Sequence, residues 1–165
     1  MKRTLALLLL LFAAAAFAEP SPHERAFERY KSLEGKWRGK STKGWTEEMT
    51  YRVIAGGSVV MSTSFDAHPN ETMATMIHLD RGTLMLTHYC VAKNQPRLAA
   101  TEISPDGKKI VFTFRDATGI ASRDTGHMDK AVIEFVDDDH FTTQWTWYAK
   151  GAERWMEKIE CERIR

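Results

Sequence analysis

The sequence predicts an all-β protein, an up-and-down antiparallel β-barrel of about ten strands with one short N-terminal helix. From Trp45 to the C-terminus, apolar and polar residues alternate in short runs, which is the period of half-buried strands. Tight turns rich in glycine, asparagine and aspartate separate these runs and are typical of hairpins. Consecutive hairpins place sequential strands side by side, and such a sheet removes its exposed edges by closing on itself.

Residues 1–18 are predicted to be a secretory signal peptide. Lys2 and Arg3 form a positive region, an apolar run extends from Leu5 to Ala16, and Ala16-Phe17-Ala18 is a small-x-small cleavage site. The apolar run is shorter than the roughly 18–20 residues that a membrane-spanning helix needs. We therefore expect an exported protein, periplasmic or extracellular, without a membrane span after cleavage. An uncleaved N-terminal anchor is the alternative.

Residues 19–165 are predicted to form a single domain. Cleavage of the 165-residue chain leaves 165 − 18 = 147 residues, the size of one domain with a real core. Loss of Lys2 and Arg3 lowers the count of Lys+Arg from 23 to 21 against 22 Asp+Glu, so the net charge becomes 21 − 22 = −1. These charges are scattered along the chain, which argues against nucleic acid or an anionic membrane as partner. The sequence predicts no oligomeric state.

The first element is predicted to be an amphipathic helix. Ser21 is placed to cap its N-terminus, with Pro22 at the first helical position and Glu24 completing a capping box. An apolar stripe follows at a spacing of three and is expected to cover one end of the barrel: Phe27, Tyr30 and Leu33. Gly35 ends the helical segment, and the first strand carries Trp37.

The predicted strands then follow to the end of the chain, at residues 37–41, 45–53, 58–65, 72–79, 83–91, 97–103, 110–115, 128–136, 141–148 and 154–164. Turns are expected at 55–58 and 67–70, among others, and residues 117–126 form the longest irregular stretch, which we interpret as a lid or rim. The last strand should pair with the first, burying Trp37 at the closed end. Its inward face is predicted to carry Trp155, Glu157, Ile159, Cys161 and Arg163.

Alternation along the strands predicts a lumen with both polar and aromatic side chains, including Thr75 and Asp129. The residues expected to bind a ligand there are His88, Arg97, Glu47, Tyr51, Gln95, Trp145 and Glu157. Such a lumen suits a small amphipathic molecule with an acidic or hydrogen-bonding head, whose carboxylate Arg97 would clamp through its planar guanidinium. Alternatively, Arg97, Glu47 and Glu157 satisfy one another as a buried ion network.

Two pairs of residues have the chemistry of metal ligands. His88 and Cys90 lie two apart on one strand, and His127 and Asp129 repeat this spacing. Zinc accepts such ligands, but no third or fourth ligand is fixed by spacing, so hydrogen-bonded structural histidines are the favoured interpretation. A set of methionines is interpreted as core filler rather than a copper site: Met73, Met76, Met85 and Met128.

The two cysteines, Cys90 and Cys161, fall in the fifth and tenth predicted strands. These strands are not neighbours in a closed meander, and the Cα atoms of a disulfide must approach within about 7 Å. Two free thiols are therefore favoured, with a disulfide as the alternative.

Several local motifs carry a resemblance to known proteins. They are Gly35-x-Trp37, His88-Tyr89-Cys90 with Asn94-Gln95-Pro96-Arg97, Gly126-His127-Met128, and Phe141 running into Gln144-Trp145-Thr146-Trp147-Tyr148. With the helix before it, Gly35-x-Trp37 resembles the calycin superfamily, which includes lipocalins, fatty-acid-binding proteins and ten-stranded nitrobindin-like barrels. The other motifs carry a more particular resemblance. Over nearly the whole of residues 19–165, the chain resembles a family of exported bacterial lipocalin-like barrels. That family often has histidine where this chain has Asp129, which weakens a metal site there.

The expected function is therefore binding of a small amphipathic or acidic molecule in the lumen of a lipocalin-like barrel. The resemblance to nitrobindin-like barrels gives one alternative, a haem site with His127 or His88 as axial ligand. The other alternative is an enzyme that uses the polar residues of the lumen. The sequence has no Gly-x-Ser-x-Gly elbow, Walker loop, His-Glu-x-x-His motif or dinucleotide-binding glycine fingerprint.

Overall fold

The computed structural model describes residues 19–64 and 72–165, so the predicted signal peptide and the predicted turn at 67–70 lie outside the described residues. A helix, α1 (Pro22–Lys31), precedes ten strands, and a 3-10 turn, η1 (Ala55–Gly57), joins the second strand to the third. The strands are β1 (Gly35–Ser41), β2 (Thr46–Ile54), β3 (Val59–Ser64), β4 (Met73–Asp80), β5 (Thr83–Tyr89), β6 (Gln95–Ile103), β7 (Lys109–Thr118), β8 (His127–Phe135), β9 (His140–Ala149) and β10 (Ala152–Ile164).

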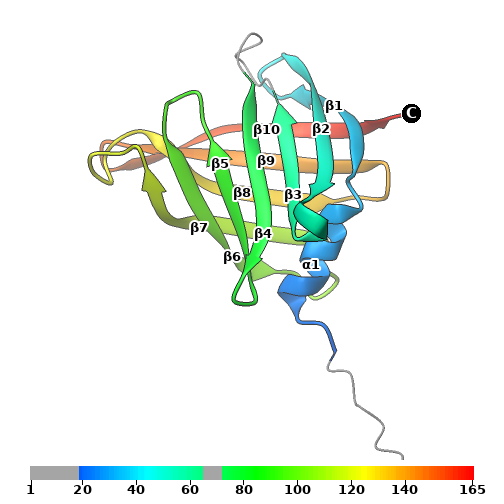
Figure 1. The fold of residues 1–165 in the computed structure, drawn as a ribbon. Coiled ribbons are helices and arrows are strands. Elements are labelled where there is room, and N and C mark those ends of the chain that lie inside the picture. Colours follow the sequence, from blue (N-terminus) through cyan, green and yellow to red (C-terminus); the bar gives the residue numbers. More distant parts are fainter. Residues whose placement is uncertain (1–18, 65–71) are drawn as a thin grey trace, which may run out of the picture.

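The ten strands form one closed antiparallel barrel, shown in Figure 1. Each strand pairs with its neighbours in sequence, and β10 returns to pair with β1 from Lys36 opposite Ile164 to Ser41 opposite Ile159. The predicted fold class is confirmed. Closure gives each of the ten strands two partners, so no described strand lies at the edge of an open sheet.

The helix α1 begins with the predicted capping box. The Ser21 hydroxyl accepts from the Glu24 backbone N–H at 3.2 Å, and the Glu24 carboxylate accepts from the Ser21 backbone N–H at 2.7 Å. Phe27 and Tyr30 are buried against the barrel, where the Tyr30 ring makes edge contacts with Phe112 and Phe135. No helix in the described part of the chain is both long and apolar enough to span a membrane.

Trp37 fills the end of the barrel that α1 covers, as predicted. Its side chain is fully buried, and its indole N–H donates to the Leu33 carbonyl at 2.7 Å. Phe141 packs edge-on against the indole with 4.7 Å between ring centroids, and the Arg163 guanidinium lies 4.3 Å from it. Trp37 therefore contacts the segment after α1, the closing strand β10 and β9 at once.

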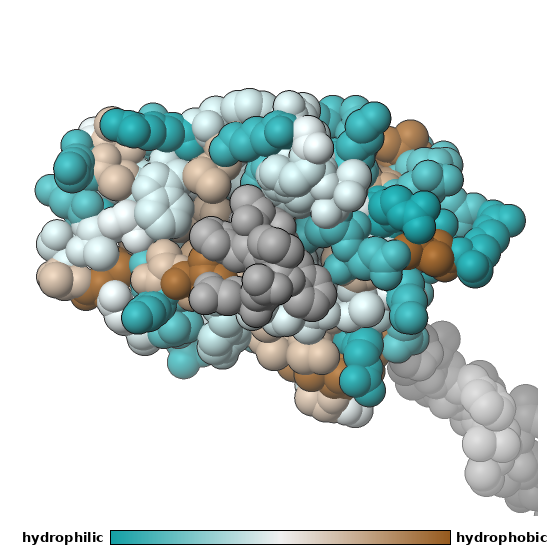
Figure 2. Space-filling view, turned by 90° about the horizontal axis from the view of Figure 1, so that it is seen from above, coloured by the Kyte–Doolittle hydropathy of each residue, from teal (hydrophilic) through white to brown (hydrophobic). Residues whose placement is uncertain are grey.

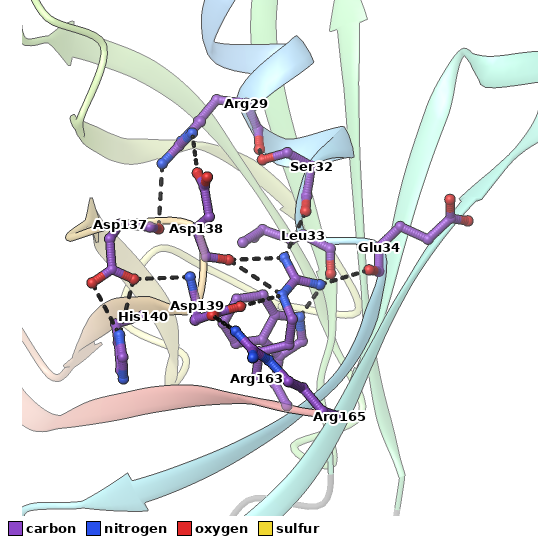
Figure 3. Close-up of polar contacts among 11 residues, drawn as sticks. Arg29, Ser32, Leu33, Glu34, Asp137, Asp138, Asp139, His140, Arg163 and Arg165 are labelled. Atoms are coloured by element: carbon purple, nitrogen blue, oxygen red, sulfur yellow. Dashed lines mark hydrogen bonds and ion pairs between the residues drawn. The ribbon is translucent and has the colours of Figure 1, made fainter.

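The turn between β8 and β9 fastens this closed end from outside, as Figure 3 shows. Arg163 of β10 donates to the carbonyl oxygens of Ser32 and Glu34 at 2.9 Å and of Asp138 at 3.0 Å. Arg29 of α1 forms an ion pair with the Asp138 carboxylate at 3.2 Å. The fork of Arg163 thus supplies donors to carbonyls beyond the C-terminus of α1, where backbone acceptors lack helical partners.

The prediction that Trp155 faces the lumen is wrong, because alternation breaks in β10. A bulge shifts the β9–β10 register between Trp155 and Glu157, and the Trp155 side chain is 53% exposed. Beyond the bulge, Glu157, Ile159 and Cys161 are buried as predicted. A bulge adds one residue to its strand, so the residues before it change face.

Gly39 makes room for the side chains of its neighbouring strands. A Cβ at this position would lie 2.8 Å from the Ile159 side chain, 3.0 Å from Met49 and 3.1 Å from Glu47. Glycine is therefore required by close packing inside β1. Cys161 is buried on the same wall, and Cys90 and Cys161 are not joined in a disulfide, in agreement with the favoured prediction.

Candidate functional site

The barrel has two separate spaces that a ligand could use. A cavity of about 60 Å³ lies in the lumen, and a pocket of about 570 Å³ lies among residues at the end remote from α1. We call the first the lumen cavity and the second the mouth pocket. Five of the seven predicted ligand-binding residues line the lumen cavity: Glu47, Tyr51, His88, Trp145 and Glu157.

The acidic side of the lumen cavity is formed by β1, β2 and β10. The Ser41 hydroxyl donates to the Glu157 carboxylate at 2.7 Å, and Glu157 is 3% exposed. Burial, with Cys161 and Glu47 close by, raises the pKa of the Tyr51 hydroxyl well above its usual value. Tyr51 is therefore a neutral phenol at any physiological pH.

His88 forms the opposite side of the cavity. Its Nδ1 lies 3.0 Å from the Thr75 hydroxyl, and its ring centroid lies 5.2 Å from that of Trp145, whose register partner is Glu157. Burial lowers the pKa of His88 to about 4, so the imidazole is neutral at pH 7. Its Nε2 is buried without a hydrogen-bond partner among the described residues.

Arg97 and Gln95 do not reach the lumen cavity, so their predicted role there is wrong. Arg97 is exposed on the outside of β6, where its guanidinium holds Asp116 in a bidentate pair at 2.5 and 2.6 Å. Gln95 accepts from the Thr118 hydroxyl at 2.6 Å. In β6 the next residue, Leu98, points inward and is fully buried. Moving an aliphatic side chain out of water is favourable, whereas moving a guanidinium out of water is costly.

The lumen cavity is small for the guest expected from the sequence, an amphipathic molecule with an acidic or hydrogen-bonding head, and its described wall offers no cation to an acidic head. A cavity of about 60 Å³ is well below the roughly 300–1,000 Å³ of pockets for metabolite-sized ligands. Among the described residues that line it there are two carboxyl side chains and no lysine or arginine. The alternative of an Arg97, Glu47 and Glu157 ion network is also wrong, since Arg97 lies outside the barrel.

The segment between β7 and β8, residues 119–126, is fastened to the barrel by Arg123. Its guanidinium lies between two rings, 4.3 Å from the centroid of Phe114 and 3.8 Å from that of Tyr148. It also forms an ion pair with the buried Asp129 carboxylate. Asp129, predicted to face the lumen, instead supplies the charge that holds this segment.

His127 is a structural histidine. Its Nδ1 donates to the Thr125 carbonyl at 2.5 Å, and its Nε2 faces the Arg123 guanidinium. A bulge between Met128 and Lys130 puts Met128 on the lumen wall in place of Asp129. His127 and Asp129 lie on one face as predicted, with 3.5 Å between His127 Nε2 and Asp129 Oδ1. That face is turned toward the 119–126 segment and not toward the lumen.

The metal and haem interpretations find little support in this geometry. Within residues 19–64 and 72–165, no three His, Cys, Asp or Glu side chains are grouped to hold a metal ion. His88 and Cys90 line different spaces, the lumen cavity and the mouth pocket. A porphyrin does not fit the lumen cavity beside His88, and both ring nitrogens of His127 are engaged.

The mouth pocket combines apolar walls with positive charge. Figure 2, seen from above, shows hydrophobic side chains beside strongly hydrophilic ones on the side of the molecule remote from α1. The pocket is lined by Lys43, Met73, Cys90, Val91, Ala92, Met128, Trp147, Arg154, Trp155 and Met156. Met73 and Met128 line the lumen cavity as well, so they form the partition between the two spaces.

Most residues of the mouth pocket were missed by sequence reasoning. Lys43 lies in the turn after β1, Arg154 at the start of β10 and Cys90 just after β5. Alternation reports which face of a strand a residue occupies, not which loops meet at one end. The order of the predicted turns could have grouped these residues, because every second turn of an up-and-down barrel lies at the same end.

Comparison of the chain with protein-family models and with curated proteins finds no match in either.

Proposed function

We propose that this protein is an exported binding protein that holds a small amphipathic acid in the mouth pocket. The observation that carries the proposal is the pocket itself, whose volume of about 570 Å³ falls in the range of small-molecule sites. This moves the expected guest from the lumen to the end of the barrel, because the lumen cavity has neither the volume nor the charge for it.

The apolar part of the guest would lie against sulfur and indole groups. Trp147 and Trp155 offer flat hydrophobic surfaces, and Trp155 is 53% exposed in the described structure. Met73, Met128 and Met156 surround the same space, and the unbranched thioether side chain adapts to guests of different shape. This lining favours an alkyl chain or a ring system over a sugar.

The acidic head of the guest would meet Lys43 and Arg154. Both are exposed, and no aspartate or glutamate is among the described residues that line the pocket. A carboxylate placed between an ammonium and a guanidinium gains charge-assisted hydrogen bonds while its tail leaves water.

Export rests on the sequence of residues 1–18, with its positive start, apolar run and Ala-x-Ala site. The resemblance to lipocalin-like barrels supports the assignment of ligand binding, since an antiparallel barrel with an open end is a common container for small molecules.

Titration with octanoate at constant ionic strength tests the proposal, with indole fluorescence as the readout. We expect saturable quenching, because two tryptophans line the pocket. In the double variant Lys43→Gln/Arg154→Gln, octanoate should bind about tenfold more weakly, since each exposed ion pair contributes up to about 1 kcal/mol. Lys36→Gln, an exposed lysine at the other end of β1, is the matched control and should bind as the wild type does.

Absence of saturable binding of both octanoate and decanoate would overturn the proposal. Equal weakening by Lys36→Gln and by the double variant would show a general effect of protein charge and would also overturn it.

A further inference from the structure

The lumen cavity has a chemistry opposite to that of the mouth pocket. Glu47 and Glu157 are 6% and 3% exposed and both line it. Their carboxyl groups come from β2 and β10, which flank β1, and Gly39 of β1 leaves space between them for the side chains of its neighbours. The described wall contributes no lysine or arginine. The cavity therefore presents two carboxyl groups and, among its described residues, no cationic side chain, so a bound cation would favour their ionised, hydrogen-bond-accepting form.

Two buried polar atoms in side chains that line the same cavity have no hydrogen-bond partner among the described residues. They are the Tyr30 hydroxyl at the α1 end and Nε2 of His88, in side chains that are 2% and 4% exposed. Buried polar groups are nearly always hydrogen-bonded in folded proteins, and an orphan marks a place for water or a ligand. This observation is independent of the two carboxyl groups and concerns the opposite side of the cavity.

The hydrogen-bonding groups of the cavity wall determine which kind of molecule would bind there. A carboxylate only accepts hydrogen bonds, and a neutral imidazole offers one acceptor nitrogen. An anion would face two acidic groups, and a neutral alcohol offers a single donor. A primary ammonium group offers three donors and a positive charge, which matches several acceptors at once.

The size of the cavity limits the occupant to a small group. A space of about 60 Å³ holds a few water molecules or one ammonium group with a short carbon stem. The stem can point toward Met73 and Met128, whose flexible side chains separate the cavity from the mouth pocket.

We propose that the lumen cavity is a second binding site, which takes the protonated amino group of a small primary amine between Glu47, Glu157 and His88. The site does not depend on occupation of the mouth pocket. It extends the function of the barrel to a class of ligand with the opposite charge.

Ethylammonium chloride is the probe, titrated into the full mature protein at pH 7.5 with sodium chloride held to constant ionic strength. Chemical shifts of the His88 imidazole and the Trp145 indole N–H report on the cavity. We expect saturable shifts with a Kd in the millimolar range, and no saturable shift with ethanol or sodium acetate. Glu157→Gln and Glu47→Gln should each weaken ethylammonium at least about tenfold, because each replaces a carboxyl group that can pair with the cation by a neutral amide.

Glu48→Gln is the matched control, since Glu48 follows Glu47 on β2 but faces solvent beside Arg38 at 3.9 Å. It should bind ethylammonium as the wild type does. The proposal is overturned if ethanol shifts the same resonances equally, if no shift saturates in the wild type, or if Glu48→Gln weakens binding as much as Glu157→Gln does. The comparison of the three probes needs only the wild type, and octanoate quenching on the same sample reports separately on the mouth pocket.

Discussion

Replacing Trp37 should destabilise the barrel more than any replacement of an exposed tryptophan. The side chain is fully buried, its N–H satisfies the Leu33 carbonyl at 2.7 Å, and Phe141 and Arg163 pack on its ring. Truncation of a core tryptophan to alanine costs about 3–5 kcal/mol, and the orphaned carbonyl adds about 1–3 kcal/mol. Trp37→Ala should therefore lose about 4–8 kcal/mol of a total stability of about 5–15 kcal/mol.

Urea unfolding followed by far-ultraviolet circular dichroism measures this loss. Trp155→Ala is the matched control, because this side chain is 53% exposed and its removal should change stability by no more than about 0.5 kcal/mol. Trp37→Phe keeps an aromatic ring but not the donor to Leu33, so a loss of about 1–3 kcal/mol is expected even if Trp37→Ala fails to fold. Wild-type stability in Trp37→Phe, or equal losses in the two alanine variants, would refute the reasoning.

Three further predictions concern the titration of the lumen, the outer face of β6 and the thiols. The pKa of His88 is about 4 in the fold against 6.5 in the unfolded chain, so the unfolded state binds more protons between these values. Stability is then complete above pH 6.5 and falls by up to about 3 kcal/mol as the pH drops toward 4, and urea unfolding at pH 7 and 4.5 should show a smaller fall in His88→Gln than in the wild type. Arg97→Gln should cost no more than about 1 kcal/mol in urea unfolding and leave octanoate binding unchanged, because its pair with Asp116 is exposed; a large loss of binding would return Arg97 to the site. Burial raises the pKa of the Cys161 thiol, so a thiol-specific reagent should label Cys161 only after unfolding, and a reducing agent should leave the thermal midpoint unchanged.

Much of the fold could be predicted because several local signals agree. The capping box at Ser21, the apolar stripe of α1 and the alternation in β2 each specify one element, and together they leave closure as the way to bury Trp37. Alternation also placed Glu47, Tyr51 and Glu157 on the lumen wall correctly. These positions depend only on the period of a regular strand.

The predictions were wrong where a bulge breaks the alternation of a strand, and incomplete where residues from distant parts of the sequence meet at one end of the barrel. Bulges in β8 and β10 changed the faces of Asp129 and Trp155, and no residue type marks those bulges in the sequence. Arg97 was given the wrong face, although placing Leu98 inward would have corrected it. Lys43 and Arg154 line the same pocket because the β1–β2 turn and the start of β10, which lie far apart in sequence, are brought together when β10 pairs with β1.

The pairing of β1 with β10 also determines when the barrel can close during folding. β1 is the first of the ten described strands, but its second partner, β10 at residues 152–164, is the last of them. Until β10 arrives, one edge of β1 is open and Trp37 lacks the cover of Arg163. Contacts of such long sequence separation form slowly, so the unclosed chain stays accessible to chaperones until β10 pairs with β1. Pairing of these two strands is thus the step that protects the folding chain from association through its open edge.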